Sequence, residues 1–169
     1  PSRWARAVFV LDPWFASPAR VGCNRYGHLL ETLAELHSSL RARGSRLFVV
    51  RGSPLEVLPK LWSAWGVGRL VFERDTEPYA VKRDAQVLTA ATAAGLTVTV
   101  APGHTLYDPD AVLAKCGGAP PLTYEAFRRV IATLPAPPRP LPAPAVLPPA
   151  AACRPGIVEE LGVAAAGIS

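Results

Sequence analysis

The sequence predicts an α/β fold in which helices flank a parallel β-sheet. Short apolar segments rich in β-branched residues alternate along the chain with longer segments that have helical periodicity. Such short runs are typical of strands buried on both faces of a parallel sheet. Four strands are expected, at residues 7–11, 47–50, 70–72 and 97–100. Their spacing is that of Rossmann-like βαβ units with right-handed crossovers.

The helices have recognisable ends. The first and longest is expected at 24–43, where leucines recur at helical spacing and Gly44 follows. The second begins after Ser53, with Pro54 at its first position and Glu56 three residues after the serine, a pattern that predicts a capping box. Further helices are expected from Pro78 to Gly95, after Asp108-Pro109, and from Thr123 to Thr133.

Composition separates the chain into two parts. Residues 1–133 are expected to form the α/β domain, whereas nine of the 21 residues from 135 to 155 are proline. Proline at that density excludes regular helix or sheet, so residues 134–169 are predicted to be a Pro/Ala-rich connector or disordered tail, with a helical turn at 158–161. The chain has no methionine and begins at Pro1, which predicts a fragment or an incomplete gene model.

Charge and cysteine content bound the function. The formal net charge of +5 comes from fifteen Arg and three Lys against thirteen acidic residues. A basic surface would favour nucleic acid or an acidic partner. The alternative is that the arginine content only reflects a GC-rich coding sequence and has no functional meaning. Three widely spaced cysteines fit neither a disulfide framework nor a zinc site, so a reducing compartment is expected. No apolar run is long enough to cross a membrane.

No motif for a self-contained catalytic centre is present. The sequence lacks GxSxG, GxxxxGK[ST] and GxGxxG. The three histidines, His28, His37 and His104, are not accompanied by other metal-ligating residues at metal spacing. Neither a metal site nor catalysis is therefore expected in this segment.

Polar and aromatic residues gather where the predicted strands end. The carboxyl ends of parallel strands meet at one edge of a sheet, where α/β proteins bind ligands. The residues expected there are Asp12, Trp14, Phe15, Arg51, Glu73, Asp75 and Tyr79. They suit a pocket for a planar ligand or for a partner's side chain. The alternative is that the acidic residues only cap helices and turns.

Seven segments, in order and with matching spacing, carry a resemblance to animal cryptochromes of the cryptochrome/DNA photolyase family. They are VLDPWF (10–15), VGCNR (21–25), RLFVVRGSP (46–54), WGV (65–67), FERDTEPYAVKRD (72–84), GHTLYD (103–108) and PPLTYEAFRRVI (120–131). The resemblance covers about residues 7–133. It implies the amino-terminal α/β domain of that family.

The resemblance also implies that this domain is incomplete. The family's first strand, central in the strand order 3-2-1-4-5, would precede anything present here. The remaining strands would then face a gap with unpaired edges and exposed apolar faces. We expect the chain to be marginally stable or aggregation-prone by itself.

Cofactor and partner expectations follow from the resemblance alone. FAD would bind in a helical domain outside this segment, and the α/β domain would offer a cleft for an antenna pigment or for a side chain of a PAS-domain clock transcription factor. The matching cleft residues are Asp12, Pro13, Phe15, Tyr79, Ala80 and Arg83, and the loop from Phe15 to Val21 belongs to the same cleft. Arg83 would be the polar anchor.

The expected function is regulatory. The intact protein would be a non-catalytic flavoprotein of the nucleus and cytoplasm that acts in circadian transcriptional repression or as a blue-light photoreceptor. The alternative is a light-driven DNA photolyase, an enzyme with DNA as its partner. An unrelated nucleotide-binding α/β domain is a third interpretation, which the absence of a phosphate-binding loop disfavours.

Overall fold

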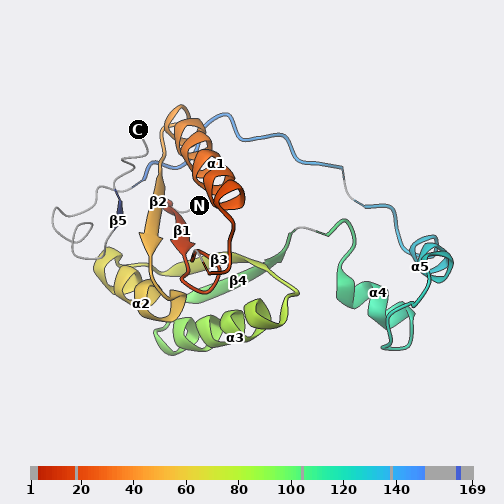
Figure 1. Ribbon diagram of the computed structural model, residues 1–169. Coiled ribbons are helices and arrows are strands. Elements are labelled where there is room, and N and C mark those ends of the chain that lie inside the picture. The colour runs from red at the N-terminus through yellow and green to blue at the C-terminus, as the bar shows by residue number, and fades with distance from the viewer. Residues whose placement is uncertain (1–3, 18, 104, 138, 151–162, 165–169) are drawn as a thin grey trace.

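The computed structural model describes residues 4–17, 19–103, 105–137 and 139–150, and the backbone of 163–164. Strands and helices alternate through most of the chain (Figure 1), in the order β1 (Ala7–Leu11), α1 (Cys23–Arg41), β2 (Leu47–Arg51), α2 (Pro54–Trp65), β3 (Arg69–Arg74), α3 (Pro78–Ala93), β4 (Thr97–Pro102), α4 (Pro109–Lys115), α5 (Tyr124–Ile131) and β5 (Val163–Ala164). The predicted α/β class and its four strands are confirmed.

The strands form two parallel pairs. β1 pairs with β2, with Ala7 opposite Leu47, and β3 pairs with β4, with Arg69 opposite Thr97. Within the described residues, no ladder joins β1 to β3, so the sheet is interrupted between them. This is the position of the gap that the family resemblance implied. β5, which the sequence did not predict, pairs antiparallel with the other edge of β2.

β2 is the centre of the core because both of its faces are covered. Successive side chains of a strand point to opposite faces, so Phe48 and Val50 pack against α2, whereas Leu47 and Val49 pack against Leu33 of α1. All four strand residues are buried. β2 therefore matches the prediction of a strand buried on both faces.

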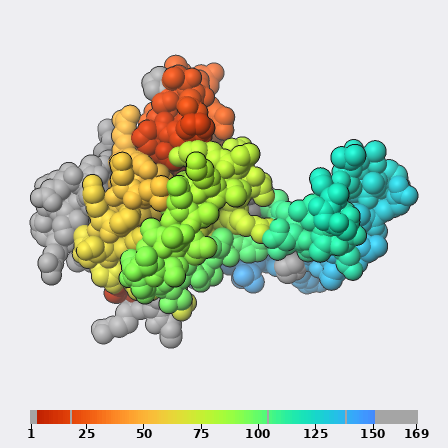
Figure 2. Space-filling model, turned by 90° about the horizontal axis from the view of Figure 1, so that it is seen from below, coloured from red at the N-terminus to blue at the C-terminus, as the bar shows by residue number. Residues whose placement is uncertain are grey.

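β3 and β4 depart from that prediction. One face of the pair packs on Trp62 of α2 and on Val87 and Ala91 of α3, and α2 and α3 lie side by side in Figure 2. The other face is open, since Val71 is 60% exposed and Thr99, its partner on β4, is also exposed. The expectation of two buried faces was wrong for this pair, because the described elements put helices on one side only.

Helix ends follow the sequence signals with one exception. Gly66 ends α2 with a left-handed φ of 59°, and the side chains of Asp108 and Thr123 accept backbone N–H groups at the starts of α4 and α5. Ser53 precedes α2, as predicted, but its side chain makes no cap hydrogen bond. The predicted capping box is therefore wrong, although the helix begins at the expected residue.

The last described segments extend away from the sheet and then return. α4 and α5 project as an arm (Figures 1 and 2). Residues 134–137 and 139–150 contain neither helix nor strand. This segment returns to the α/β unit, where the N–H of Leu147 donates to the carbonyl of Arg43 at 3.2 Å and the N–H of Ala5 donates to that of Pro149 at 3.3 Å. The turn predicted at 158–161 lies outside the described residues.

In the described part of the chain, none of the helices combines the length and apolar character that crossing a membrane requires.

Candidate functional site

Asp12 lies at the carboxyl end of β1 and links this strand to α3. Its side chain is buried. The Oδ1 atom accepts the backbone N–H of Trp14 at 2.9 Å, and Oδ2 accepts the hydroxyl of Tyr79, in the first turn of α3, at 2.6 Å. Asp12 therefore organises the turn after β1, as the turn-capping alternative predicted. The same carboxylate also positions two aromatic residues, Trp14 and Tyr79, at this end of the sheet.

Two aromatic rings lie at this end of β1, and a guanidinium group lies near each of them. The rings of Trp14 and Tyr79 stack with centroids 4.5 Å apart and planes 12° from parallel. The guanidinium carbon of Arg20 lies 3.5 Å from the centroid of Trp14, and that of Arg83 lies 5.8 Å from the centroid of Tyr79. We call Asp12, Trp14, Arg20, Tyr79 and Arg83 the Trp14 cluster. Trp14 remains 44% exposed, so the cluster presents an exposed aromatic surface.

Arg83, the predicted polar anchor, is bound to its neighbour in sequence. Its Nε donates to Oδ1 of Asp84 at 2.8 Å, and its Nη2 lies 2.8 Å from the same oxygen. Adjacent helical residues ordinarily point in different directions, so this pair had no sequence signal. The second oxygen of Asp84, Oδ2, is buried and has no hydrogen-bond partner among the described residues.

The environment of Tyr79 raises its pKa to about 12. The largest cause is burial, which disfavours the phenolate, followed by the hydrogen bond to Asp12 and the negative charge of that carboxylate. The nearby guanidinium groups of Arg83 and Arg20 act in the opposite direction. The hydroxyl therefore remains a hydrogen-bond donor at neutral pH.

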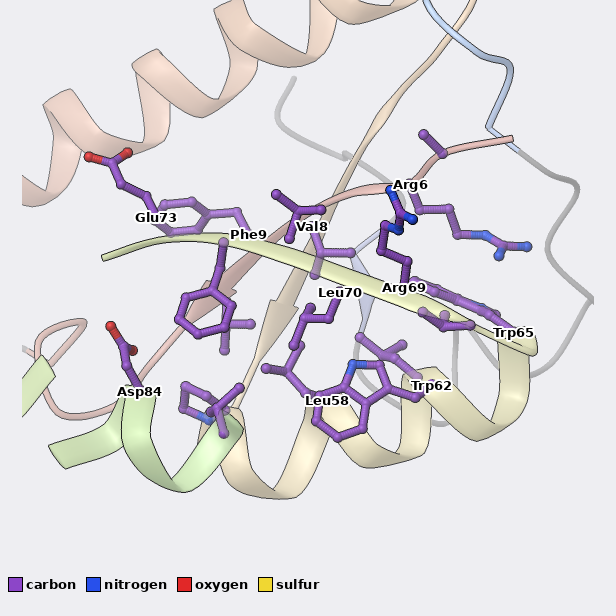
Figure 3. Close-up of a pocket in the computed structure, with 18 of the residues that line it drawn as sticks. Arg6, Val8, Phe9, Leu58, Trp62, Trp65, Arg69, Leu70, Glu73 and Asp84 are labelled. Carbon is purple, nitrogen blue, oxygen red and sulfur yellow. The ribbon is translucent and has the colours of Figure 1, made fainter. Parts of the chain in front are cut away.

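A cavity of about 610 Å³ lies beside the cluster, between β1, β3 and α2 (Figure 3). Its walls are mostly apolar, and they include Val8 and Val10 of β1. Asp12, Phe15 and Arg83 also line it. Three of the six predicted cleft residues thus border this cavity.

The other predicted residues have separate positions. Tyr79 belongs to the aromatic stack, Pro13 is exposed in the turn after β1, and Ala80 is buried. Ala80 therefore offers a partner no contact surface in this conformation. Among the other strand-end residues, Arg51 is exposed, and Asp75 accepts the N–H groups of the two residues that follow it. Contact of the six predicted cleft residues with a partner or a pigment stays a prediction.

Asp84 is a member of this region that the predicted cleft lacked, and Arg20 was covered only as part of the predicted loop to Val21. Arg20 comes from the loop before α1, and only the path of that loop brings it over Trp14. An arginine near an exposed tryptophan is a signal for a cation–π contact. Sequence alone does not place the two together.

A second polar contact lies at the carboxyl end of β3. Arg74 donates to Asp108 at 2.7 Å and to Asp110 at 2.5 Å, which joins the strand to the start of α4. These hydrogen bonds raise the pKa of Arg74 above its ordinary value. Because the pair is exposed, its contribution to stability is small.

Metal-ligating side chains do not gather in the described residues, where no three His, Cys, Asp or Glu are placed to hold an ion. His28 is exposed, and Nδ1 of His37 lies 3.3 Å from the carbonyl oxygen of Leu47. His104 lies outside the described residues. The described histidines thus have no arrangement for metal chemistry.

Sequence comparison connects the chain with one family. The family model described as DNA photolyase matches residues 3–145. Cryptochrome-2 of Gallus gallus is 46% identical over 136 residues, which is 80% of this chain but 23% of the relative. The chain therefore spans about a quarter of that relative's length.

Solved structures share the fold. A bacterial class III photolyase from Agrobacterium tumefaciens matches with a TM-score of 0.77 and 26% identity, covering 89% of this chain and 30% of that one. An archaeal photolyase from Sulfolobus tokodaii, solved with two FAD molecules, matches with a TM-score of 0.58 and 20% identity over 79% of this chain and 29% of that one. The second likeness concerns the fold alone.

Proposed function

Because the chain belongs to the cryptochrome/DNA photolyase family, we propose that it is the partner-binding α/β segment of a regulatory cryptochrome. The intact protein acts in circadian transcriptional repression, in the nucleus and cytoplasm. The Trp14 cluster receives a side chain from the PAS domain of a clock transcription factor. The single observation that carries this proposal is the half-exposed indole of Trp14, held between Arg20 and Tyr79.

The chemistry of the cluster is that of an interface hot spot. Trp, Tyr and Arg are the residue types that contribute most to binding when they lie at the centre of an interface. The cluster contains one Trp, one Tyr and two Arg. Its exposed indole offers a large apolar contact area beside the cationic Arg20. A partner side chain that is aromatic or acidic fits both properties.

Preorganisation lowers the cost of binding at this surface. Asp12 fixes the backbone of Trp14 and the hydroxyl of Tyr79 at the same time. Ring stacking then restricts the side chain of Trp14 before any partner arrives. Since immobilising a flexible side chain costs about 0.5–1.5 kcal/mol on association, a surface that is already ordered retains more of its contact energy.

The test is isothermal titration of this chain with the PAS domain of a clock transcription factor. We expect Trp14→Ala to weaken binding by roughly 30-fold, the loss typical of a hot-spot residue. Tyr124→Ala is the matched control, because Tyr124 is 76% exposed on α5, away from the cluster. Equal affinities of the unsubstituted chain and Trp14→Ala, both with native circular dichroism, would overturn the proposal.

FAD, which this family binds, does not fit the described residues of this segment. Proteins bind a diphosphate at helix amino termini, which lie at the carboxyl ends of the strands in this fold. At that end the cavity is lined by the guanidinium of Arg83, which pairs with Asp84, and by three carboxylates, those of Asp12, Glu73 and Asp84. Their negative charge disfavours a diphosphate. We therefore assign the flavin to a domain outside this segment, as the family resemblance implies.

DNA photolyase is the second candidate, favoured by the likeness to the Agrobacterium tumefaciens class III enzyme. A blue-light photoreceptor with an antenna pigment in the same region is a variant of the first candidate. Light-dependent repair of a pyrimidine dimer by the intact protein would select the photolyase. Binding of the PAS domain without repair supports the regulatory function.

A further inference from the structure

We propose that residues 139–144 are a docking site for a protein module that binds polyproline II helices. The sequence of the site is Arg-Pro-Leu-Pro-Ala-Pro. The partner is a module of the SH3 type, with a groove lined by aromatic side chains and a carboxylate at one end of that groove. This inference does not rest on the proposed PAS-domain function, because the segment shares no residue with the Trp14 cluster.

The local sequence restricts every residue of this segment to an extended conformation. Residues 140, 142 and 144 are proline, whose ring fixes φ at about −65°. Residues 139, 141 and 143 each precede a proline, which disfavours the α region for them. None of the six belongs to a helix, strand or turn. The segment therefore favours the polyproline II helix, which needs no internal hydrogen bonds.

The segment is held at its carboxyl end and is otherwise open to solvent. All six residues are exposed, and Leu141 is 91% exposed. Nε of Arg43 donates to the carbonyl of Pro144 at 3.3 Å, and Arg43 in turn accepts the N–H of Leu147. Figure 1 shows the segment, in blue, between α5 and the end of α1. A partner can thus reach a segment that is already extended, which lowers the ordering cost of binding.

The three-residue turn of a polyproline II helix gives the segment three edges, because residues three apart lie on the same edge. The edges are Arg139 with Pro142, Leu141 with Pro144, and Pro140 with Ala143. A groove contacts two edges, and the third faces solvent. The first two edges carry the cation, the leucine and two of the three prolines. We therefore assign these two edges to the groove and the edge of Pro140 to solvent.

Arg139 defines the charge of the partner and the direction of the segment in the groove. A polyproline II helix presents similar surfaces in both directions, so a charged residue at one end is needed to fix its orientation. Arg139 comes before the apolar residues, and among the described residues it has no ion-pair partner. A carboxylate in the partner's groove can pair with its guanidinium by charge-assisted hydrogen bonds. A purely aromatic groove would leave this cation unused.

The experiment titrates this chain into an array of purified, fluorophore-labelled SH3 domains that carry an acidic residue in the groove, with fluorescence anisotropy as the readout. We expect binding of one domain per chain, with a dissociation constant in the micromolar range. Arg139→Ala should weaken binding about tenfold, the loss expected for a charge-assisted hydrogen bond. Arg139→Lys should recover part of the affinity, because it keeps the charge without the planar guanidinium.

Two prolines provide the matched pair of variants. Pro142→Ala should weaken binding roughly fivefold, because it removes an apolar contact with the groove. Pro140→Ala makes the same chemical change on the solvent edge and should leave the affinity unchanged. Both positions are exposed, so native circular dichroism is expected for both variants. If Pro142→Ala does not fold, Leu141→Ala removes a contact of the second edge and should weaken binding similarly.

Three results would overturn the proposal: no SH3 domain bound at about 1 mM of this chain, unchanged affinity of Arg139→Ala, or equal losses for Pro140→Ala and Pro142→Ala. An array of WW domains is titrated in parallel. Binding of WW domains alone would assign the segment to a different groove, and it would also overturn the proposal.

Discussion

The hydroxyl of Tyr79 donates a 2.6 Å hydrogen bond to the carboxylate of Asp12, which lies 67 residues earlier in the chain. This contact joins the end of β1 to the start of α3 across the interrupted sheet. It also fixes the ring of Tyr79 against that of Trp14. Stability and the shape of the proposed partner surface therefore depend on the same pair.

Replacing Tyr79 with phenylalanine removes the hydroxyl and leaves a buried carboxylate oxygen without its donor. We expect Tyr79→Phe to lower the free energy of unfolding by about 1–3 kcal/mol, the cost of an unsatisfied buried polar group. Urea denaturation measures the loss. Tyr124→Phe, at a 76% exposed position on α5, is the control and should change stability by less than about 0.5 kcal/mol.

The raised pKa of Tyr79, about 12, predicts a pH dependence at the alkaline end. The folded state holds this proton more tightly than the unfolded state, whose tyrosine ionises near its ordinary value of about 10. The contribution of the protonated Tyr79 hydroxyl to the free energy of unfolding is therefore complete below about pH 10, and it is lost as the pH rises through 12. The measurement is the phenolate absorbance of the unsubstituted chain as a function of pH. Subtracting the same titration of Tyr79→Phe leaves the absorbance of Tyr79 alone. A difference titration centred at pH 10 would contradict the assignment.

Gly52, at the end of β2, has a backbone conformation that other residues rarely adopt. Its φ is +142°, and an added Cβ would lie 2.7 Å from Cγ1 of the buried Val57. We expect Gly52→Ala to destabilise the chain by about 1–3 kcal/mol in urea denaturation. Gly68→Ala is the control, because a Cβ there meets no atom within 4 Å and Gly68 has no positive φ. Equal effects of the two substitutions would show that Gly52 is not strained.

A substitution of Arg83 distinguishes partner binding from flavin binding. Arg83→Ala in the intact protein should weaken association with the PAS domain, because it removes a cation from the Trp14 cluster. Its flavin content, measured by absorbance, should stay unchanged, since we assign FAD to another domain. Unaltered association would remove Arg83 from the proposed surface. Loss of flavin would show that this segment helps to hold the cofactor.

The interrupted sheet predicts low thermal stability. Val71 is 60% exposed on the open face of β3, and in the described residues the facing edges of β1 and β3 lack strand partners. We expect differential scanning calorimetry of the chain to give a weak transition near room temperature, or aggregation. A cooperative transition far above room temperature would count against this expectation.

Local sequence signals predicted most of the secondary structure. Strand β2 is a run of apolar residues followed by Gly52, and Gly66 and Gly95 follow helices with the positive φ that glycine readily adopts. β4 carried a signal that was not used. Its alternation of threonine and valine from residue 97 is typical of a strand buried on one face only, as observed.

Tertiary contacts were less predictable because they depend on loop paths. The positions of Asp12 and Tyr79 at one sheet edge followed from the α/β topology, but the stack of Trp14 on Tyr79 and the position of Arg20 did not. The pairing of Arg83 with Asp84 depends on side-chain rotamers. The family resemblance anticipated the interruption between β1 and β3, whereas the pairing of β5 with β2 had no sequence signal.

Chemical-shift mapping of the isotope-labelled chain during titration with the PAS domain tests the central claim most directly. We predict that the largest perturbations fall on the indole N–H of Trp14 and on the backbone amides of Phe15 and Tyr79. Amides of α5 should remain unchanged. Perturbations confined to α4 and α5, with the Trp14 indole unmoved at saturation, would contradict the claim that the Trp14 cluster is the partner-binding surface.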